Sequence, residues 1–478
     1  MTSTVPTYLE LGFKSNAQEA VYENVVVKGS IPQWLEGSLI RNGPGVVHAN
    51  KPMKHWFDGL AMLHKFNIHH GRVSYQSRYI DCDAYRSYKQ TGQFLYSDFA
   101  TDPCRSLFGK IQTLFSKDPM ITDSAKVNVG SVNGGFYALG EPLMQVRIDP
   151  KTLKSLGVFD YGLTARSRMT TAHPHIDGHQ TFNLVVEYGP INYYSIYTMG
   201  PDSKKVASVP VYEPGYIHSF GMTENYFIIA EFPLVVQSLK LAFRLKPFIE
   251  NFHWKPSNGS RFIIIDRKTG KRKATVKCDA FFSFHHVNAF EIGDRLVVDM
   301  ATYEDASIIE SYYINRLSNP SNKIPFGRME RFELDLNSQK LLSRKVVSNE
   351  CIELPNIEYH KRHGDANYKF VYGCGMNDES PEGFYNQLVR IDMSNGASLK
   401  WYESGCYPGE PVFVSSPDGV SEDDGVLLSV VLDPSYNRSF LLVLNAKTMK
   451  ECARAELPLH ISFGYHGTFL NETDFLHD

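Results

Sequence analysis

The sequence predicts an all-β fold, specifically a seven-bladed β-propeller. Two observations support this prediction: a strand–turn–strand pattern that recurs along the chain, and histidine and glutamate residues at matching places after that pattern. The 478 residues, of which 42% are hydrophobic, provide enough apolar side chains for a large core. We expect one domain over residues 1–478.

The recurring pattern is a short apolar strand, a polar turn and a second short strand, which is typical of a β-hairpin. It occurs in the segments 64–79, 145–161, 195–212, 262–278, 330–347, 388–404 and 441–457. In a propeller, each hairpin would form the outer pair of a blade, and the next apolar run would be an inner strand. A β-sandwich is the alternative, because hairpins recur in that fold too.

The composition excludes several classes of protein. The formal net charge of -3 gives no basic surface for nucleic acid. No run of about eighteen apolar residues is present, so we expect no membrane-spanning helix, and the N-terminus lacks the pattern of a signal peptide. The seven cysteines form no CxxC pair, which favours reduced thiols in a cytoplasmic protein.

A set of histidines shares one place in the repeat, shortly after a hairpin, where an inner strand is expected. They are His173, His218, His285 and His466. Because inner strands line the central channel, we expect these side chains to converge. Four neutral imidazoles suit Fe(II), Zn(II) or Cu(II). Their neighbours His175, His179 and His286 are alternatives on spacing alone.

Two glutamates, Glu353 and Glu410, occupy the same place in the repeat as the histidines. A glutamate in an apolar channel costs several kcal/mol unless it has a partner. Metal-bound imidazoles usually donate their second N–H to a carboxylate. We therefore expect these glutamates to orient metal-binding histidines.

At these residues the chain resembles the carotenoid cleavage oxygenase family, in stretches spread over almost its whole length. The shared stretches are RNGPG (41–45), HWFDGLAMLHKF (55–66), AHPHID (172–177), YIHSFGMTENY (216–226), FHHVNAFE (284–291), YPGEPVFV (407–414), EDDGVLLSVVLD (422–433), LLVLNAKTM (441–449) and YHGTF (465–469). The likeness is greatest to the animal-type branch, which includes β-carotene oxygenases and a retinoid isomerohydrolase. TDPCR (101–105) departs from that branch's PDPCK at Thr101 and Arg105.

The resemblance implies a site, residue by residue. The family's iron ligands fall on His173, His218, His285 and His466, with His285 chosen over His286 because the first histidine of FHxxN is the ligand. The family's three glutamates fall on Glu141, Glu353 and Glu410, which would orient His218, His285 and His466 in that order. Glu141 is assigned by the resemblance alone, and His173 would have no carboxylate partner. The implied fold is a seven-bladed propeller with a dome of loops and short helices over the iron.

The resemblance also implies an activity. We expect one Fe(2+) per chain, and a dioxygenase reaction in which O2 and a carotenoid or apocarotenoid give two aldehydes. Central cleavage of β-carotene at the 15,15' bond, giving retinal, is the specific expectation. Eccentric cleavage, apocarotenoid or stilbene cleavage, and retinyl ester isomerohydrolysis on the same iron are alternatives. A propeller that serves as an interaction scaffold is the non-enzymatic alternative.

Two segments have the residue pattern of a helix that lies on a membrane surface. Residues 234–249 are apolar, with basic residues at helical spacing, and 105–115 are similar. Each predicts either an interfacial segment that lies on a bilayer or a lid helix, and the resemblance favours docking. We therefore expect a cytoplasmic protein that is peripherally associated with membranes. Cys104 is a candidate for acylation or a buried free thiol.

Overall fold

Strands dominate the computed structural model, which describes residues 7–16, 18–48, 52–102, 122–159, 168–200, 202–238, 241, 246–319, 322–377 and 384–471. The described helices are short: α1 Thr7–Gly12, α2 Asp83–Thr91, α5 Ser307–Ser311, α6 Ile314–Leu317, α7 Tyr359–Arg362, η1 Ile249–Asn251, η2 Pro256–Asn258 and η3 Pro434–Tyr436. The all-β prediction is confirmed.

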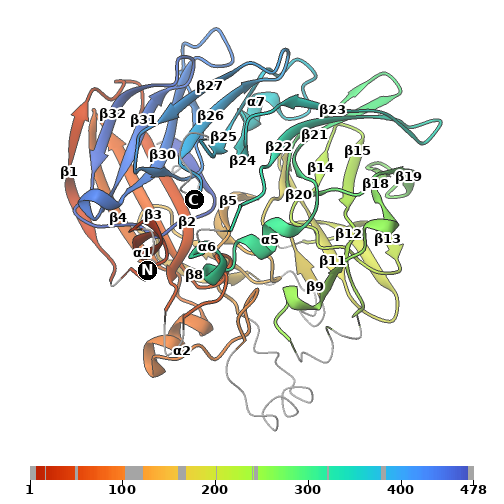
Figure 1. The fold of residues 1–478 in the computed structure, drawn as a ribbon, viewed down its shortest axis with the longest axis horizontal. Coiled ribbons are helices and arrows are strands. Elements are labelled where there is room, and N and C mark those ends of the chain that lie inside the picture. Colours follow the sequence, from red (N-terminus) through yellow and green to blue (C-terminus); the bar gives the residue numbers. More distant parts are fainter. Residues whose placement is uncertain are drawn as a thin grey trace.

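Five separate sheets of four or five strands lie around a common centre (Figure 1). The first two contain β5 Asn128–Val132, β6 Gly135–Leu139, β7 Gln145–Ile148 and β8 Ser155–Phe159, and then β9 Arg168–Thr170, β10 His175–Asp177, β11 Gln180–Glu187, β12 Asn192–Thr198 and β13 Lys205–Val211. The third contains β14 Gly221–Met222, β15 Tyr226–Glu231, β18 Ser260–Asp266 and β19 Arg272–Cys278. The last two contain β20 Phe282–Ile292, β21 Arg295–Tyr303, β22 Arg328–Asp335 and β23 Lys340–Ser348, and then β24 Glu353–Asn356, β25 Phe370–Gly375, β26 Gln387–Asp392 and β27 Ser398–Tyr402.

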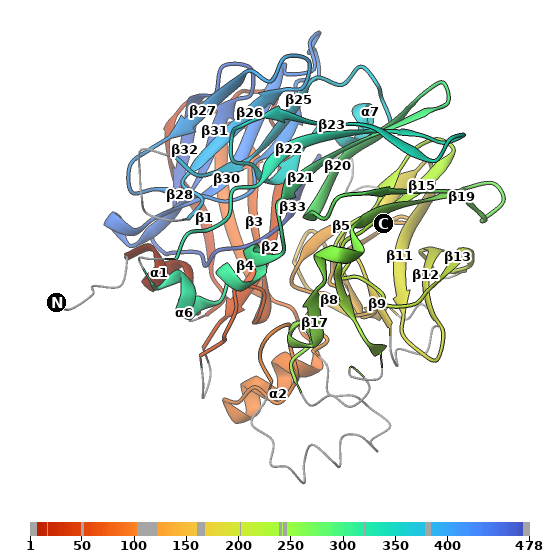
Figure 2. The same cartoon turned by 45° about the vertical axis from the view of Figure 1, so that its right-hand side comes forward.

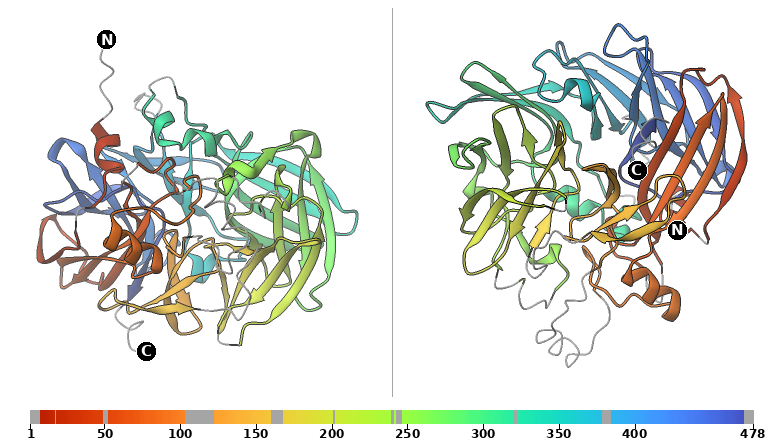
Figure 3. Two further views of the ribbon diagram at one scale, coloured as in Figure 1. Left: turned by 90° about the horizontal axis from the view of Figure 1, so that it is seen from below. Right: turned by 180° about the vertical axis from the view of Figure 1, so that it is seen from behind.

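A ten-stranded sheet joins the two ends of the chain. Its strands are β28 Tyr407–Pro408, β29 Val412–Ser415, β30 Gly425–Asp433, β31 Arg438–Asn445, β32 Lys450–Glu456, β1 Val21–Gly29, β4 Arg72–Tyr79, β3 Leu60–His69, β2 Gly37–Val46 and β33 Gly467–Asn471. The N-terminal strands lie beside the C-terminal ones in both views of Figure 3, so the arrangement of sheets is propeller-like.

The number of blades differs from the expected seven. The first part of β1 pairs with β4, from Val21 to Val25, and its last four residues, Val26 to Gly29, pair with β32. One strand therefore connects two neighbouring sheets by hydrogen bonds. Seven blades are counted only when the ten-stranded sheet is divided at β1.

All seven predicted hairpins are present as antiparallel pairs: β3–β4, β7–β8, β12–β13, β18–β19, β22–β23, β26–β27 and β31–β32. Most share one turn chemistry, in which an Asp or Asn side chain near the end of the first strand accepts a backbone N–H two or three residues later. These residues are Asp149, Asp266, Asp335, Asp392 and Asn445. Such side chains stabilise turns, which explains the regular recurrence of the pattern.

The short helices lie at the edges of the sheets, with α2 and α6 on the lower side in Figure 2 and α7 on the upper side. The segment 234–249 is not one helix, because its first residues form β16 Leu234–Val236, paired with β17 Phe252–Trp254. Cys104, the segment 105–115 and residues 239, 240 and 242–245 lie outside the described residues. None of the helices in the described part of the chain has the length and apolar character needed to cross a bilayer.

Candidate metal centre and cavity

The structure brings the four predicted histidines together. One imidazole nitrogen from each of His173, His218, His285 and His466 lies within 4.8 Å of the other three. His285 is on β20, whereas the other three lie in short segments outside the strands, just before β10, β14 and β33. The expectation that all four lie on strands is therefore wrong for three of them, because the hydrogen-bonded strands β10, β14 and β33 begin one to three residues after the histidine.

Three of these histidines contact the predicted glutamates. His218 Nδ1 lies 2.7 Å from Glu141 Oε1, and His466 Nδ1 lies 2.7 Å from Glu410 Oε1. His285 Nδ1 contacts Glu353 Oε1. Among the described residues, His173 has no carboxylate contact, and its Nε2 lies 3.2 Å from the Nε2 of His218.

The glutamates are themselves held by further donors. Tyr216 Oη donates to Glu141 at 2.7 Å, and Tyr303 Oη donates to Glu353. Glu410 accepts from the guanidinium of Arg41 and from the backbone N–H of Gly467, the latter at 2.9 Å. Buried carboxylates that receive several hydrogen bonds are held in one orientation.

From the sequence alone, no contact with these glutamates was predicted for Arg41, Tyr216 or Tyr303. The RNGPG stretch that contains Arg41 is part of the family resemblance. Its place in that stretch is the only feature of the sequence that pointed to a function for Arg41.

Electrostatics favour a neutral His285 and ionised Glu353 and Glu410. Burial lowers the pKa of His285 to about 4, against the opposing effect of Glu353. Burial raises the pKa of Glu353, but the contacts with His285 and Tyr303 outweigh it and lower this pKa below its usual value. For Glu410, His466 and Arg41 outweigh burial in the same way and lower the pKa.

The donor set fits a metal ion. A carboxylate only accepts, so the Nδ1 of His285 and of His466 carries the proton, and in a neutral ring the Nε2 then carries a lone pair. These two Nε2 atoms lie 3.2 Å apart. Such lone pairs repel one another unless a cation lies between them, and four imidazole nitrogens suit a divalent transition metal.

The neighbouring histidines have other contacts. His175 bonds Tyr359 Oη and the Phe220 carbonyl at 2.8 and 2.7 Å, and His286 Nδ1 lies 2.9 Å from Ser219 Oγ. His179 is exposed. None of these three belongs to the cluster of four within the described chain.

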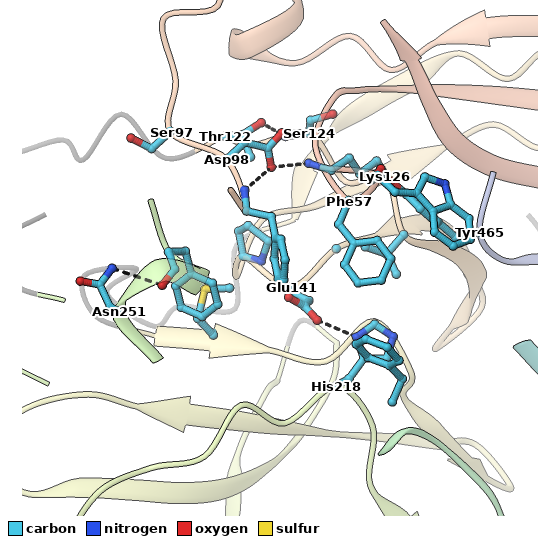
Figure 4. A pocket seen from close by; sticks show the side chains of 18 of the residues that line it. Phe57, Ser97, Asp98, Thr122, Ser124, Lys126, Glu141, His218, Asn251 and Tyr465 are labelled. Atoms are coloured by element: carbon cyan, nitrogen blue, oxygen red, sulfur yellow. Dashed lines mark hydrogen bonds and ion pairs between the residues drawn. The ribbon is translucent and has the colours of Figure 1, made fainter. Parts of the chain in front are cut away.

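A cavity of about 540 Å³ adjoins the cluster and includes His218, His285 and His466 in its wall. The aromatic residues Phe57, Phe99 and Tyr312 line it, whereas Tyr303 and Tyr313 are not part of its wall. Figure 4 shows Phe57 between the His218–Glu141 pair and the polar residues of the opposite wall, which are Asp98, Thr122, Ser124 and Lys126. A mostly apolar cavity beside a group of converging polar side chains is typical of a small-molecule site.

Comparison with known proteins agrees with this geometry. The family model described as retinal pigment epithelial membrane protein matches residues 13–471. The chain belongs to this family. Together with relatives named as carotenoid dioxygenases, this match confirms the resemblance to carotenoid cleavage oxygenases.

Relatives and solved structures are similar over nearly the whole chain. The human "Carotenoid-cleaving dioxygenase, mitochondrial" is 31% identical, over 93% of this chain and 87% of the relative. The chicken "Beta,beta-carotene 15,15'-dioxygenase" is 32% identical, over 94% and 95%. A crystal structure of a cobalt-substituted Synechocystis apocarotenoid oxygenase has a TM-score of 0.86 at 26% identity, over 98% of this chain and 100% of that one. That neighbour therefore holds a metal ion.

Proposed function

We propose that this protein is a non-haem Fe(II) dioxygenase that cleaves a carotenoid double bond to two aldehydes. The observation that carries the proposal is the convergence of four imidazole nitrogens, backed by buried glutamates, beside a largely apolar cavity. Relatives named as carotenoid dioxygenases support this reaction over the alternatives. An interaction scaffold would give no reason for buried histidine–glutamate pairs.

In this proposal, His173, His218, His285 and His466 hold one Fe(2+) per chain. Bound ferrous iron would supply the redox chemistry that lets dioxygen react with an electron-rich alkene. Glu141, Glu353 and Glu410 keep the Nδ1 protons of three rings in place, so each Nε2 presents a lone pair to the ion. Metal analysis of the purified protein tests the proposal, and full iron occupancy in His218→Ala or His466→Ala would contradict the ligand assignment.

The cavity residues position the substrate and exclude water. Phe57, Phe99 and Tyr312 provide apolar and aromatic surface against which a polyene packs. One C=C bond is replaced by two C=O bonds, and both atoms of O2 are incorporated in the products. Which double bond reacts depends on the depth at which the cavity stops the substrate.

Central cleavage of β-carotene, giving two molecules of retinal, is the specific proposal. The test is incubation with β-carotene under air, followed by chromatography of the aldehydes. Retinal as the main product supports central cleavage, and aldehydes of unequal length would contradict it. If iron is bound and no carotenoid gives an aldehyde, stilbene cleavage or retinyl ester isomerohydrolysis is favoured.

We also propose that the protein docks on a membrane surface, because carotenoids dissolve in bilayers. Support comes from Leu241, Lys246 and Phe248, which line the cavity and belong to the segment 234–249. Cosedimentation with lipid vesicles tests this, and its absence would contradict docking. The cytoplasmic location and the single domain over residues 1–478 stay predictions.

A further inference from the structure

A second, smaller cavity of about 40 Å³ lies beside the large one. Trp56 and Leu354 line both cavities, so these two side chains form the partition between them. A single water molecule needs about 10–15 Å³ of such space. The small cavity therefore has room for a molecule of two or three heavy atoms and excludes a carotenoid ring.

The small cavity lies next to groups that hold the metal-binding histidines in place. Its wall includes Arg41, whose guanidinium donates to Glu410. It also includes Leu354, which directly follows Glu353 in the chain. A small molecule in this cavity would therefore contact the neighbours of two of the buried glutamates while it stays outside the large cavity.

Much of the wall of the small cavity is apolar. Its apolar side chains include Phe384, Val430, Leu432, Ile461 and Phe463. All of these except Val430 are at most 8% exposed, so they are withdrawn from bulk water. Cavities lined by apolar side chains stay dry and bind apolar atoms or molecules such as xenon.

Polar side chains in the same wall have partners within the protein. Asn42 Nδ2 donates to two backbone carbonyl oxygens, at 2.7 and 2.9 Å, and Ser462 Oγ donates to a third at 2.6 Å. Arg41 donates to Glu410 and to the carbonyl oxygen of Tyr465. These hydrogen bonds do not depend on water in the cavity.

Leu354, in the partition, has a strained backbone. Its φ is +49°, although it lies within the strand β24. Other non-glycine residues with positive φ, such as Leu153 and Gln339, lie in hairpin turns. Left-handed backbone is unusual for a bulky residue, and strain of this kind is concentrated at functional sites.

The strain coincides with a β-bulge. Glu353 pairs with Cys374 and Asn356 pairs with Tyr372, so β24 has one residue more than β25 between these two pairs. A bulge changes the direction of a side chain and is common next to active sites. Here it places Leu354 in the wall of both cavities.

We propose that the small cavity binds dioxygen, and that Leu354 is the gate through which dioxygen passes to the large cavity. The inference rests on the proposed function, in which O2 and a polyene are needed at the metal together. A polyene that fills the large cavity blocks that route for O2, whereas the small cavity stays free. O2 is a small apolar molecule, which suits a dry apolar wall.

Leu354 is the part of the partition that can move. Trp56 is fixed by a hydrogen bond from its Nε1 to the carbonyl oxygen of Phe463, at 3.2 Å. A leucine side chain changes rotamer without breaking a hydrogen bond. Rotation of Leu354 therefore opens the partition while Trp56 keeps its place.

Xenon is the probe of the small cavity, because it is apolar and enters dry cavities in proteins. Crystals of the iron-loaded protein are exposed to xenon under pressure, without a polyene. We expect xenon in the small cavity of the native protein. Ordered water in that cavity, with xenon excluded, would overturn the inference.

Val430 allows the small cavity to be filled or enlarged. Val430→Met adds a flexible side chain that fills irregular space, so it should exclude xenon, whereas Val430→Ala should hold at least as much xenon as the native protein. Val347→Met is the matched control, because Val347 is also a partly buried strand residue and lines neither cavity. It should bind xenon as the native protein does.

The dependence of the rate on oxygen is measured with the same variants. For Val430→Met we expect kcat/KM for O2 to fall about 10-fold, the lower limit for one changed methylene in a closed pocket. The KM for the polyene should stay unchanged, because the wall of the large cavity is intact. An unchanged kcat/KM for O2, or an equal fall in Val347→Met, would overturn the inference. Xenon in the small cavity of a protein that cleaves no polyene would contradict the proposed dioxygenase and support a site for a small apolar gas.

Discussion

At the scale of single residues, two adjacent histidines on β20 have opposite surroundings. His285 faces Glu353 and the other three histidines of the cluster, whereas the Nε2 of His286 is buried without a hydrogen-bond partner in the described chain. Successive residues on a strand point to opposite faces. Only one of the two can reach the cluster.

The first prediction follows from this difference. His285→Ala should abolish activity and lower the iron content, because it removes one of four nitrogen donors. His286→Ala should keep the metal and lower only the stability of the fold. Metal analysis and thermal unfolding of the two variants check this, and loss of iron in His286→Ala alone would reverse the assignment.

The second prediction concerns Glu353. Its carboxylate accepts from His285, from Tyr303 and, at 3.1 Å, from the Leu354 N–H. Glu353→Gln keeps the volume but turns an NH2 group toward a donor, so we expect activity to fall about 10- to 100-fold, as is typical of groups that orient a metal ligand. The fold should be retained.

Glu330→Gln is the matched control for this change. Glu330 is another buried glutamate, paired with Arg344 and hydrogen-bonded by Thr302 away from the histidine cluster. Its replacement should lower stability without altering the rate. An unchanged rate in Glu353→Gln would show that the carboxylate does not act through His285.

At the scale of elements, one hairpin turn lies against a neighbouring sheet and another does not. Gly270, in the β18–β19 turn, has φ +68°, and a Cβ there would lie 2.3 Å from the carbonyl oxygen of Val206 on β13. Gly293, in the β20–β21 turn, has φ +58°, with nothing within 4 Å of a Cβ. Both positions need left-handed backbone, but only Gly270 is also limited by a neighbouring sheet.

The third prediction compares these two glycines. Gly293→Ala should cost about 1–2 kcal/mol of unfolding free energy, the strain of an L-residue in left-handed conformation. Gly270→Ala should cost clearly more, because backbone atoms of β13 must move as well. Urea unfolding measures both, and equal losses would mean that this contact between sheets is dispensable.

At the scale of the whole molecule, each of the four histidines lies on, or just before, a strand of a different sheet: those of β10, β14 and β20, and the ten-stranded sheet. A metal ion bound by all four would connect these sheets across the centre. The fourth prediction is therefore that metal stabilises the fold, by about 2.7 kcal/mol when free metal is at 100 times Kd. Thermal unfolding with and without a chelator measures this, and a chelator should leave the Tm of His218→Ala almost unchanged.

The sequence by itself determined the local elements of this protein. All seven hairpins could be predicted, because each depends on apolar strands and on turn residues such as Asp266 or Asp392, whose interactions are local. The histidines and glutamates of the site could be located from their place in the repeat and from the family resemblance. Both kinds of prediction used only short segments of chain.

Tertiary structure decided what depends on contacts between distant segments. The division of β1 between two sheets, the ion pair of Arg41 with Glu410 and that of Lys126 with Asp98 join residues that share no motif. Such pairings form only when the sheets close around the centre and bury the charged groups together. The histidine cluster requires the same closure, because its four side chains converge only in the folded ring of sheets.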